Sequence, residues 1–513
     1  MRSVKSIRKV LVANRGEIAI RVCRTLREMG IASVAIFSEA DQDASHVLAA
    51  DEAHPVGPAP AAQSYLDQDR VLDVARRAGA DAVHPGYGFL SESAGFAERV
   101  LEEGLVWIGP TPAAIRSLGD KLSARALALK AGVPVLPGTE QPMSDPSDLK
   151  READRIGFPV ALKAAAGGGG KGMRRVNAAG EFDQALRLTQ GEARNAFGDD
   201  RIYLERWLEK PRHIEIQLLG DSKGHVISLG ERDCSIQRRH QKLVEESPSP
   251  ALDEERRRAL GELAVRVARE GGYSNAGTAE FLMDQAGTFY FLEVNSRLQV
   301  EHPVTEMVLG LDLVREQVRL ASGESLELRQ EDVRPRGAAI EFRMYAEDSE
   351  AGFLPQAGTI RRLELPQGPG VRCDFGVRSG GSVPIHYDPL VGKIIVWGET
   401  RDQALARAAR ALGECVISGI PSTLLFHRWL VDQPAFGSGS YDTAYLSNEF
   451  RGVTRAADAR DEEDAAVIAA LFAGTSPRGP RFTSAGTSSA NGADERSRWR
   501  SAVPPFRVPP RSR

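Results

Sequence analysis

The chain has 513 residues, 42% of them hydrophobic and 27% charged, which suits a soluble globular protein of about three domains. Its 66 Lys and Arg and 70 Asp and Glu give a net charge of −4, so the chain as a whole shows no bias towards nucleic acid. No apolar run could span a membrane, no signal-peptide core precedes the first expected strand, and the four cysteines form no Cys-x-x-Cys pair; we therefore expect a cytoplasmic protein without structural zinc.

The first 119 residues alternate strand and helix patterns. Strands are expected at 10–13, 33–37, 82–84 and 106–108, and helices at 16–29 and 71–78. This series predicts a parallel sheet of Rossmann-like layout. The turn after the first strand reads Asn14-Arg15-Gly16 rather than Gly-x-Gly-x-x-Gly, so it does not predict a dinucleotide site.

Residues 120–330 form a second region of mixed α and β character. Strands are expected at 158–162, 213–218, 225–228, 277–283 and 289–294, and helices at 181–188 and 254–270. The turn-rich segment 284–287 separates the last two strands and predicts that they pair as a hairpin.

A third region, 331–450, is rich in short strand patterns. Strands are expected at 340–344, 358–363 and 393–397, followed by a helix at 402–412. Beyond 450 the pattern fades, apart from a short helical stretch at 463–472. Residues 475–513 carry eight Arg against Asp494 and Glu495, spread among Pro, Ser and Gly, so we expect 451–513 to be a disordered basic tail rather than a nucleic-acid module.

A run of four glycines, 167–170, follows the expected strand that ends near Lys163. Glycines let backbone N–H groups approach phosphate oxygens closely, and Lys163 and Lys171 would add positive charge. A glycine run taken alone is equally typical of a flexible linker. The flanking strand and lysines favour a phosphate-binding loop, although the run is not the P-loop pattern.

Glu280 and Glu293 lie on the two strands of the expected hairpin, and Asn295 follows Glu293 on the same face. Two carboxylates and an amide oxygen suit Mg²⁺, which prefers oxygen ligands and shares them with phosphates. Solvated carboxylates on an exposed strand are the alternative. Apolar neighbours argue against exposure, because buried like charges need a cation.

Arg297, Gln299 and Glu301 continue this run at alternate positions, so we expect them on one face of an extended strand. Arg offers a planar fork for an oxyanion, Gln a further hydrogen bond, and Glu a base. Alternation alone would favour an exposed charged strand. Direct continuation from the expected metal ligands favours a functional role.

Two further segments carry unusual compositions. The run 231–242 is dense in charge, which is typical of a surface loop, yet it contains Cys234 and Ile236; we interpret it as a basic wall for ATP and an anion. Cys234 has no visible activating partner and is expected to be a packed small residue. The segment 84–92 combines turn residues and aromatics, and we expect a structural turn there.

Five stretches in order, 13–19, 84–92, 167–173, 231–242 and 295–305, resemble the biotin carboxylases, a branch of the ATP-grasp enzymes. The resemblance runs from about residue 9 to 450. It implies an α/β and α+β protein with a Rossmann-like N-terminal domain (1–119), an ATP-grasp domain (120–330) with a mobile lid at about 136–206, and a biotin carboxylase C-terminal domain (331–450). The departures are Lys171, where Arg is also common, and Val294 and Ser296, where Met and Thr often stand.

The resemblance also implies roles for individual residues. ATP would be bound by Lys121, Lys163, Gly169, Gly170, Glu205, Arg206, Trp207, Leu208, His213, His240, Glu280 and Glu293. Glu280, Glu293 and Asn295 would hold Mg²⁺ or Mn²⁺, with two ions expected. Bicarbonate would be bound by Lys242, Arg297, Gln299 and the backbone of Val300. Glu301 would deprotonate it, and Arg343 would bind biotin and stabilise its ureido anion.

The implied reaction converts bicarbonate and ATP to carboxyphosphate, whose CO₂ then carboxylates biotin. Biotin is attached to Lys in a Met-Lys-Met context, and none of the seven methionines is followed by Lys, so the biotin carrier is expected to be a separate chain. A carboxyltransferase is expected as a second partner. The resemblance also implies that this chain forms a homodimer. The acceptor could be acetyl-CoA, as in fatty acid biosynthesis, propionyl-CoA, another acyl-CoA, or pyruvate. The alternatives are another ATP-grasp ligase and a non-catalytic scaffold subunit. The basic tail could contact a partner, and unchanged complex formation after deletion of 451–513 would exclude this.

Overall fold

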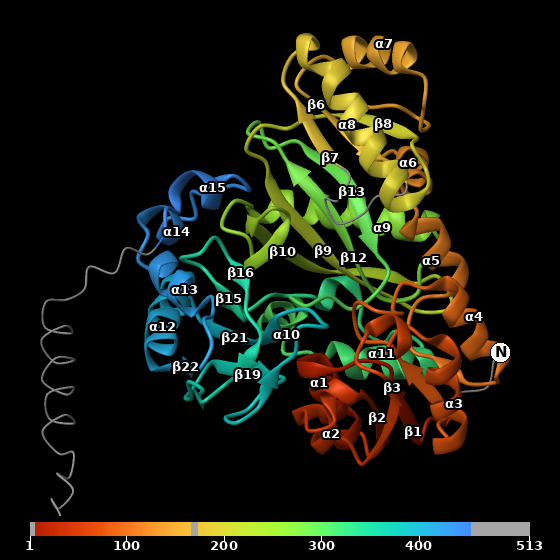
Figure 1. Cartoon of the computed structure of the whole chain (residues 1–513), viewed down its shortest axis with the longest axis vertical. Coiled ribbons are helices and arrows are strands. Elements are labelled where there is room, and N and C mark those ends of the chain that lie inside the picture. Colours follow the sequence, from red (N-terminus) through yellow and green to blue (C-terminus); the bar gives the residue numbers. More distant parts are fainter. Residues whose placement is uncertain (1–5, 166–172, 453–513) are drawn as a thin grey trace, which may run out of the picture. The chain divides into compact units, whose positions relative to one another are not determined.

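The computed structural model describes residues 6–165 and 173–452. The expected ATP-binding Gly169 and Gly170, the helical stretch at 463–472 and the expected tail from 453 onwards lie outside these residues. Figure 1 shows the course of the chain. No helix in the described ranges is both long enough and apolar enough to cross a bilayer.

The N-terminal region forms a five-stranded sheet with the order β3-β2-β1-β4-β5, in which every neighbouring pair is parallel. Its elements are β1 (Lys9–Val12), α1 (Gly16–Glu28), β2 (Ala32–Ser38), α2 (Ser45–Ala49), β3 (Glu52–Gly57), α3 (Gln68–Ala78), β4 (Ala82–His84), α4 (Ala94–Glu102), β5 (Val106–Trp107) and α5 (Pro112–Gly119). The predicted parallel sheet is confirmed. The sequence did not reveal β3, an edge strand that contains Pro55, because proline lacks the N–H of a regular ladder and interrupts the strand pattern.

A second, three-stranded sheet has the order β7-β6-β8 and its own apolar core. It is formed with α6 (Lys121–Lys130), α7 (Pro146–Ile156), β6 (Val160–Ala164), β7 (Met173–Val176), α8 (Ala179–Phe197) and β8 (Ile202–Arg206). Figure 1 shows α7 and α8 beside these strands. Because Lys163 and Glu205 lie on the central strand β6 and its neighbour β8, this sheet carries part of the expected ATP site.

The largest sheet has eight antiparallel strands in the order β13-β12-β9-β10-β11-β14-β21-β19. The elements up to residue 330 are β9 (Arg212–Gly220), β10 (Val226–Arg238), β11 (Gln241–Ser247), α9 (Glu254–Glu270), β12 (Asn275–Met283), β13 (Phe289–Asn295), α10 (His302–Leu309) and α11 (Leu313–Ser322). The predicted hairpin of β12 and β13 is confirmed. Pairing of β11 with β14 carries the sheet across the expected boundary at 330, so the second and third regions share one sheet.

The third region adds β14 (Ala338–Tyr345), β15 (Glu347–Asp348), β16 (Leu354–Pro355), β17 (Gly358–Thr359), β18 (Arg362–Glu364), β19 (Val371–Phe375), β20 (Ser382–Val383), β21 (Leu390–Gly398), α12 (Arg401–Glu414), β22 (Val416–Ser418), α13 (Leu424–Val431), α14 (Pro434–Gly437) and α15 (Tyr445–Glu449). The prediction of one strand at 358–363 is wrong. The segment makes two short strands, β17 and β18, which pair with β20 and β22 in separate sheets. The buried Ile360 between them packs into the core of this region.

Candidate active site

One open pocket collects all the expected site residues that the structure describes. They are Lys121, Lys163, Glu205, Arg206, Trp207, Leu208, His213, His240, Lys242, Glu280, Glu293, Asn295, Arg297, Gln299, Val300, Glu301 and Arg343. The pocket extends from the β6–β8 sheet across the large sheet to the start of α15. Thr443 and Ala444 also line it, and they were not expected there, because nothing in their local sequence marks them as ligand-binding.

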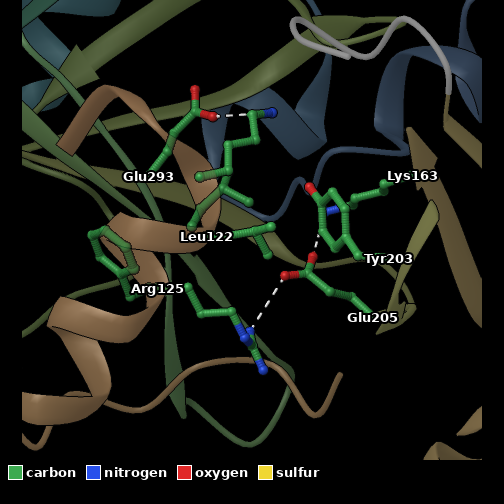
Figure 2. A pocket seen from close by; sticks show the side chains of 9 residues that line it. Leu122, Arg125, Lys163, Tyr203, Glu205 and Glu293 are labelled. Carbon is green, nitrogen blue, oxygen red and sulfur yellow. Dashed lines mark hydrogen bonds and ion pairs between the residues drawn. The ribbon is translucent and has the colours of Figure 1, made fainter. Parts of the chain in front are cut away.

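At the end of the pocket near the β6–β8 sheet, opposite charges are held in pairs. Figure 2 shows Glu205 between Arg125 and Lys163, with Glu293 across the pocket. Lys121 Nζ lies 3.4 Å from Glu293 Oε2. Burial by itself would lower the pKa of Lys121, but the neighbouring Glu293 outweighs it and the pKa is raised. Lys121 and Lys163 therefore offer two cations to a polyphosphate.

The segment 231–242 forms strand β10 and the start of β11, not a surface loop. Arg232 is fully buried, and its Nε donates to Glu215 Oε1 at 2.5 Å while its Nη2 donates to Gln299 Oε1 at 3.1 Å. Cys234 is also fully buried, which confirms the expectation of a packed residue, and burial holds its thiol pKa well above the usual value. Buried charge is tolerated here because each cation meets a carboxylate from another strand.

Lys242 is the centre of a cluster of buried carboxylates. Its Nζ donates to Glu215 Oε2 at 2.6 Å, to Glu280 Oε1 at 2.9 Å and to Glu301 Oε1 at 2.7 Å. Burial alone would raise the pKa of Glu301, but Lys242, Arg343 and Arg232 outweigh it and hold that pKa well below its usual range. Glu301 is therefore an ionised carboxylate, able to accept a proton at the wall of the pocket.

The expected metal ligands occupy the paired ends of β12 and β13. Glu280 lies directly opposite Glu293, and Thr278 opposite Asn295. Glu280 Oε1 accepts from Asn295 Nδ2 at 2.8 Å, and Glu280 Oε2 lies 2.8 Å from His213 Nε2. Two facing carboxylates and an amide, at the end of the pocket that holds Lys121 and Lys163, are a donor set that fits Mg²⁺.

The prediction that Arg297, Gln299 and Glu301 share the face of a strand is wrong. Strand β13 ends at Asn295, the next residues form a loop, and Glu301 is the N-cap residue of α10. All three side chains still reach the same pocket, because the loop turns back over the sheet to His302 and the first turn of α10.

Glu92 holds this loop from the N-terminal region. Its Oε2 accepts from Arg297 Nε at 3.0 Å, and its Oε1 accepts from the backbone N of Ser296 at 3.1 Å. Burial by itself would lower the pKa of Arg297, but Glu92 outweighs it and raises that pKa. The segment 84–92 was expected only as a turn, so this contact, which joins residues 205 positions apart, was missed.

Arg343, on β14, faces the other oxygen of the same carboxylate. Its Nη2 donates to Glu301 Oε2 at 2.9 Å, and its Nη1 donates to the Tyr345 hydroxyl at 3.2 Å. Glu301 therefore lies between two cations, Lys242 on one oxygen and Arg343 on the other. This is the arrangement expected where a base and an anion must be brought together.

Comparison with known proteins places the whole described fold in one family. The biotin carboxylase N-terminal domain matches residues 6–115, the carbamoyl-phosphate synthase L chain ATP binding domain matches 120–329, and the biotin carboxylase C-terminal domain matches 341–448. The chain belongs to the biotin carboxylase family. Its α/β and α+β fold, with Rossmann-like and ATP-grasp parts, is that of the biotin carboxylases.

Relatives in this family match nearly their full length. The biotin carboxylase of Nostoc sp. is 50% identical over 438 residues, covering 85% of this chain and 98% of the relative. A pyruvate carboxylase subunit from Methanothermobacter thermautotrophicus is 50% identical over 445 residues, covering 87% of this chain and 90% of the relative. The ATP complex of biotin carboxylase from Campylobacter jejuni has a TM-score of 0.84 at 45% identity, covering 86% of this chain and 99% of that one.

Proposed function

We propose that this protein catalyses the ATP-dependent carboxylation of biotin by bicarbonate, the first half-reaction of a biotin-dependent carboxylase. The observation that carries this proposal is Glu301, an ionised base held between Lys242 and Arg343 in the pocket that also contains Lys163 and Glu293. The names of the relatives support it. A biotin carboxylase domain from Hydrogenobacter thermophilus 2-oxoglutarate carboxylase, with a TM-score of 0.84 at 45% identity, was solved as a dimer with MgADP, ADP and bicarbonate.

In this mechanism Lys242, Arg297 and Gln299 hold bicarbonate beside Glu301. The bound anion takes up part of the positive charge of Lys242 and Arg343. The pKa of Glu301 then rises and the carboxylate becomes a better base. Glu301 accepts the bicarbonate proton while the anion attacks the γ-phosphate, giving carboxyphosphate and ADP. Carboxyphosphate breaks down to CO₂ and phosphate. The released phosphate takes the N–H proton of the biotin ureido group, and the ureido anion, facing Arg343, attacks CO₂ to form carboxybiotin.

Glu280, Glu293 and Asn295 would hold Mg²⁺, and Mn²⁺ offers similar oxygen coordination. A bound divalent ion neutralises phosphate charge, which supplies much of the catalysis in phosphoryl transfer. Lys121 and Lys163 add positive charge at the same end of the pocket. We also propose that the part of the chain at about 136–206 acts as a lid, because its sheet has a separate core and carries Lys163 and Glu205.

ATP hydrolysis by the full-length protein tests this proposal. We expect hydrolysis that requires both bicarbonate and free biotin, since neither alone completes the reaction. ATP hydrolysis at the same rate with or without bicarbonate and biotin would favour another ATP-grasp ligase. The absence of ATP hydrolysis would favour a nucleotide-binding scaffold. The intact set of acids and cations around Glu301 argues against the scaffold.

We propose that the carrier is a separate biotinylated protein that acts with a carboxyltransferase, and that this chain forms a homodimer in the cytoplasm. The first part rests on the relatives, because the biotin carboxylase of Nostoc sp. is matched over 98% of its length and the Methanothermobacter thermautotrophicus relative is named as a subunit. The relatives name pyruvate carboxylase and 2-oxoglutarate carboxylase as well as biotin carboxylase, so acyl-CoA and keto-acid acceptors both remain candidates. A pull-down from the native host, probed with streptavidin, would identify the carrier and its carboxyltransferase.

Replacing Glu92 by glutamine is expected to raise the KM for bicarbonate about tenfold and to leave the KM for ATP unchanged. The change removes a charge-assisted hydrogen bond to Arg297, worth roughly 1.5 kcal/mol. Glu98→Gln is the control, because Glu98 pairs with Arg116 on the exposed surface of the same region. Equal shifts of both KM values would mean that Glu92 supports the fold generally and not the anion site.

A further inference from the structure

Two buried glutamates near the pocket accept no hydrogen bond from the residues that the structure describes. Glu245 on β11 and Glu341 on β14 are directly opposite one another in the sheet, and both are 0% exposed. None of their four carboxylate oxygens receives a hydrogen bond from the described part of the chain. Buried carboxylate oxygens normally accept hydrogen bonds, so this arrangement requires an explanation.

The nearest cations are already shared. Arg343 Nη2 lies 2.5 Å from Glu245 Oε1, in an orientation that does not make a hydrogen bond, while it donates to Glu301 Oε2 at 2.9 Å. Lys393, on β21, donates to the Val300 carbonyl at 2.6 Å and lies 3.1 Å from Glu17 Oε1. Two cations thus face four carboxylates, those of Glu17, Glu245, Glu301 and Glu341.

The remaining charged neighbours do not neutralise the excess negative charge of these carboxylates. Lys242, on the same strand as Glu245, is bound to three other carboxylates. From α10, His302 stays neutral, because burial and the cations near it hold its pKa well below the usual value. Asp374, opposite Lys393 on β19, adds another carboxylate and pairs with Arg372. The carboxylates of this cluster outnumber its positive charges, and a bound proton would neutralise one of them.

We propose that Glu245 and Glu341 are positioning residues that share one proton across β11 and β14, and that this proton keeps the charge of Arg343 available to the anion pocket. The inference rests on the proposed function, because it assigns Arg343 and Glu301 to that pocket. Two adjacent carboxylates in an apolar setting cannot both ionise at little cost, so one proton remains between them.

The electrostatics of the two groups agree with this geometry. Burial raises the pKa of Glu245 to about 7; Arg343 opposes the rise and Glu301 adds to it. Burial likewise raises the pKa of Glu341 well above its usual value, against the opposing charge of Lys393. Loss of the shared proton would give the pair a second negative charge. Glu245, which already lies 2.5 Å from Arg343, would then hold the guanidinium more strongly, and Arg343 would be less able to hold Glu301 and the reacting anion.

The decisive test is infrared difference spectroscopy of the full-length protein near neutral pH. We expect the wild-type spectrum to contain a carbonyl stretch of a protonated carboxylic acid, shifted in D₂O, that disappears in Glu341→Gln. Glu246→Gln is the matched control, because Glu246 is the buried neighbour of Glu245 but is paired with Arg401 and Tyr441. It should keep the band. No band lost from Glu341→Gln would overturn the proposal.

The pH dependence of carboxylation gives a second readout. At neutral pH the glutamine of Glu341→Gln imitates the protonated acid, so we expect a rate within about twofold of wild type. The alkaline limb of kcat/KM should move up by about one pH unit, because the amide cannot lose the proton. Superimposed pH profiles would contradict the proposal. Glu245→Gln serves as the second variant if Glu341→Gln does not fold.

The stability of the folded protein should depend on whether the pair of Glu245 and Glu341 is protonated. Burial raises the folded-state pKa of both carboxyls above the unfolded value, so the folded protein binds protons at this pair more tightly and loses stability as pH rises through the raised values. The melting temperature of wild type should therefore fall relative to Glu341→Gln over this range. The infrared and melting results do not depend on activity. Failure of biotin carboxylation would overturn the proposed function, whereas a missing infrared band would overturn only this inference.

Discussion

The change Glu301→Gln is expected to lower the rate of biotin carboxylation by about 10²–10⁴-fold, the usual contribution of a general base. Glutamine keeps the size of the side chain and can still accept a hydrogen bond from Lys242 or Arg343, but it cannot take the bicarbonate proton. ATP binding should remain close to wild type, because the phosphate-facing Lys121 and Lys163 are untouched. Steady-state carboxylation and equilibrium nucleotide binding measure the two effects separately.

The matched control for this change is Glu306→Gln. Glu306 is a buried carboxylate of the same helix, α10, paired with Arg21 and Arg372 away from the pocket. Its loss should cost stability and leave the kcat of the folded enzyme near wild type. Carboxylation by Glu301→Gln within about tenfold of wild type would show that another group removes the proton.

The change Lys242→Met is expected to reduce the free energy of unfolding by about 3–5 kcal/mol and to abolish carboxylation. The ammonium of Lys242 neutralises Glu215, Glu280 and Glu301, all of them buried, and methionine leaves their charges facing each other. Urea denaturation of wild type and variant measures the loss. Lys223→Met, which removes an exposed hydrogen bond to Ser325, is the control and should have little effect.

The loss of Lys242 also determines how this variant responds to pH and to a second substitution. Lys242 lowers the pKa values of Glu280 and Glu301, so without it those folded-state values rise. The stability of the variant should therefore improve as pH falls, and the difference in stability from wild type should become smaller. Adding Glu215→Gln removes one of the opposing charges and should recover part of the lost stability. A stability gap that is independent of pH would show that Lys242 acts mainly by packing.

The sequence predicted those features that depend on local pattern. The alternation of residues along 277–283 and 289–294 predicted a hairpin, and the structure places Glu280 opposite Glu293 in it. The parallel N-terminal sheet followed in the same way from its buried strands. The same rule failed for Arg297, Gln299 and Glu301, because their alternation continues in a loop, where it no longer fixes a face.

What the sequence did not predict depends on partners far apart in the chain. Glu92 meets Arg297 across 205 positions, and Arg232 meets Gln299 across 67, so no local pattern reveals either pair. The end of the charged segment 231–242, from Gln237 to Lys242, lines the pocket, in agreement with the interpretation as a wall. The earlier part is a buried strand, in which Arg232 is paired with Glu215 on β9. Similarly, pairing of β11 with β14 joins two expected domains into one sheet.

The central claim is that this pocket uses ATP to place the carbon of bicarbonate on biotin. The most direct measurement is transfer of label from ¹⁴C-bicarbonate to free biotin by the full-length protein, with ATP and Mg²⁺ and with Glu301→Gln as the paired control. We expect labelled carboxybiotin that requires ATP and is nearly absent from the Glu301→Gln reaction. ATP consumption by the wild-type protein without any labelled biotin would contradict the claim.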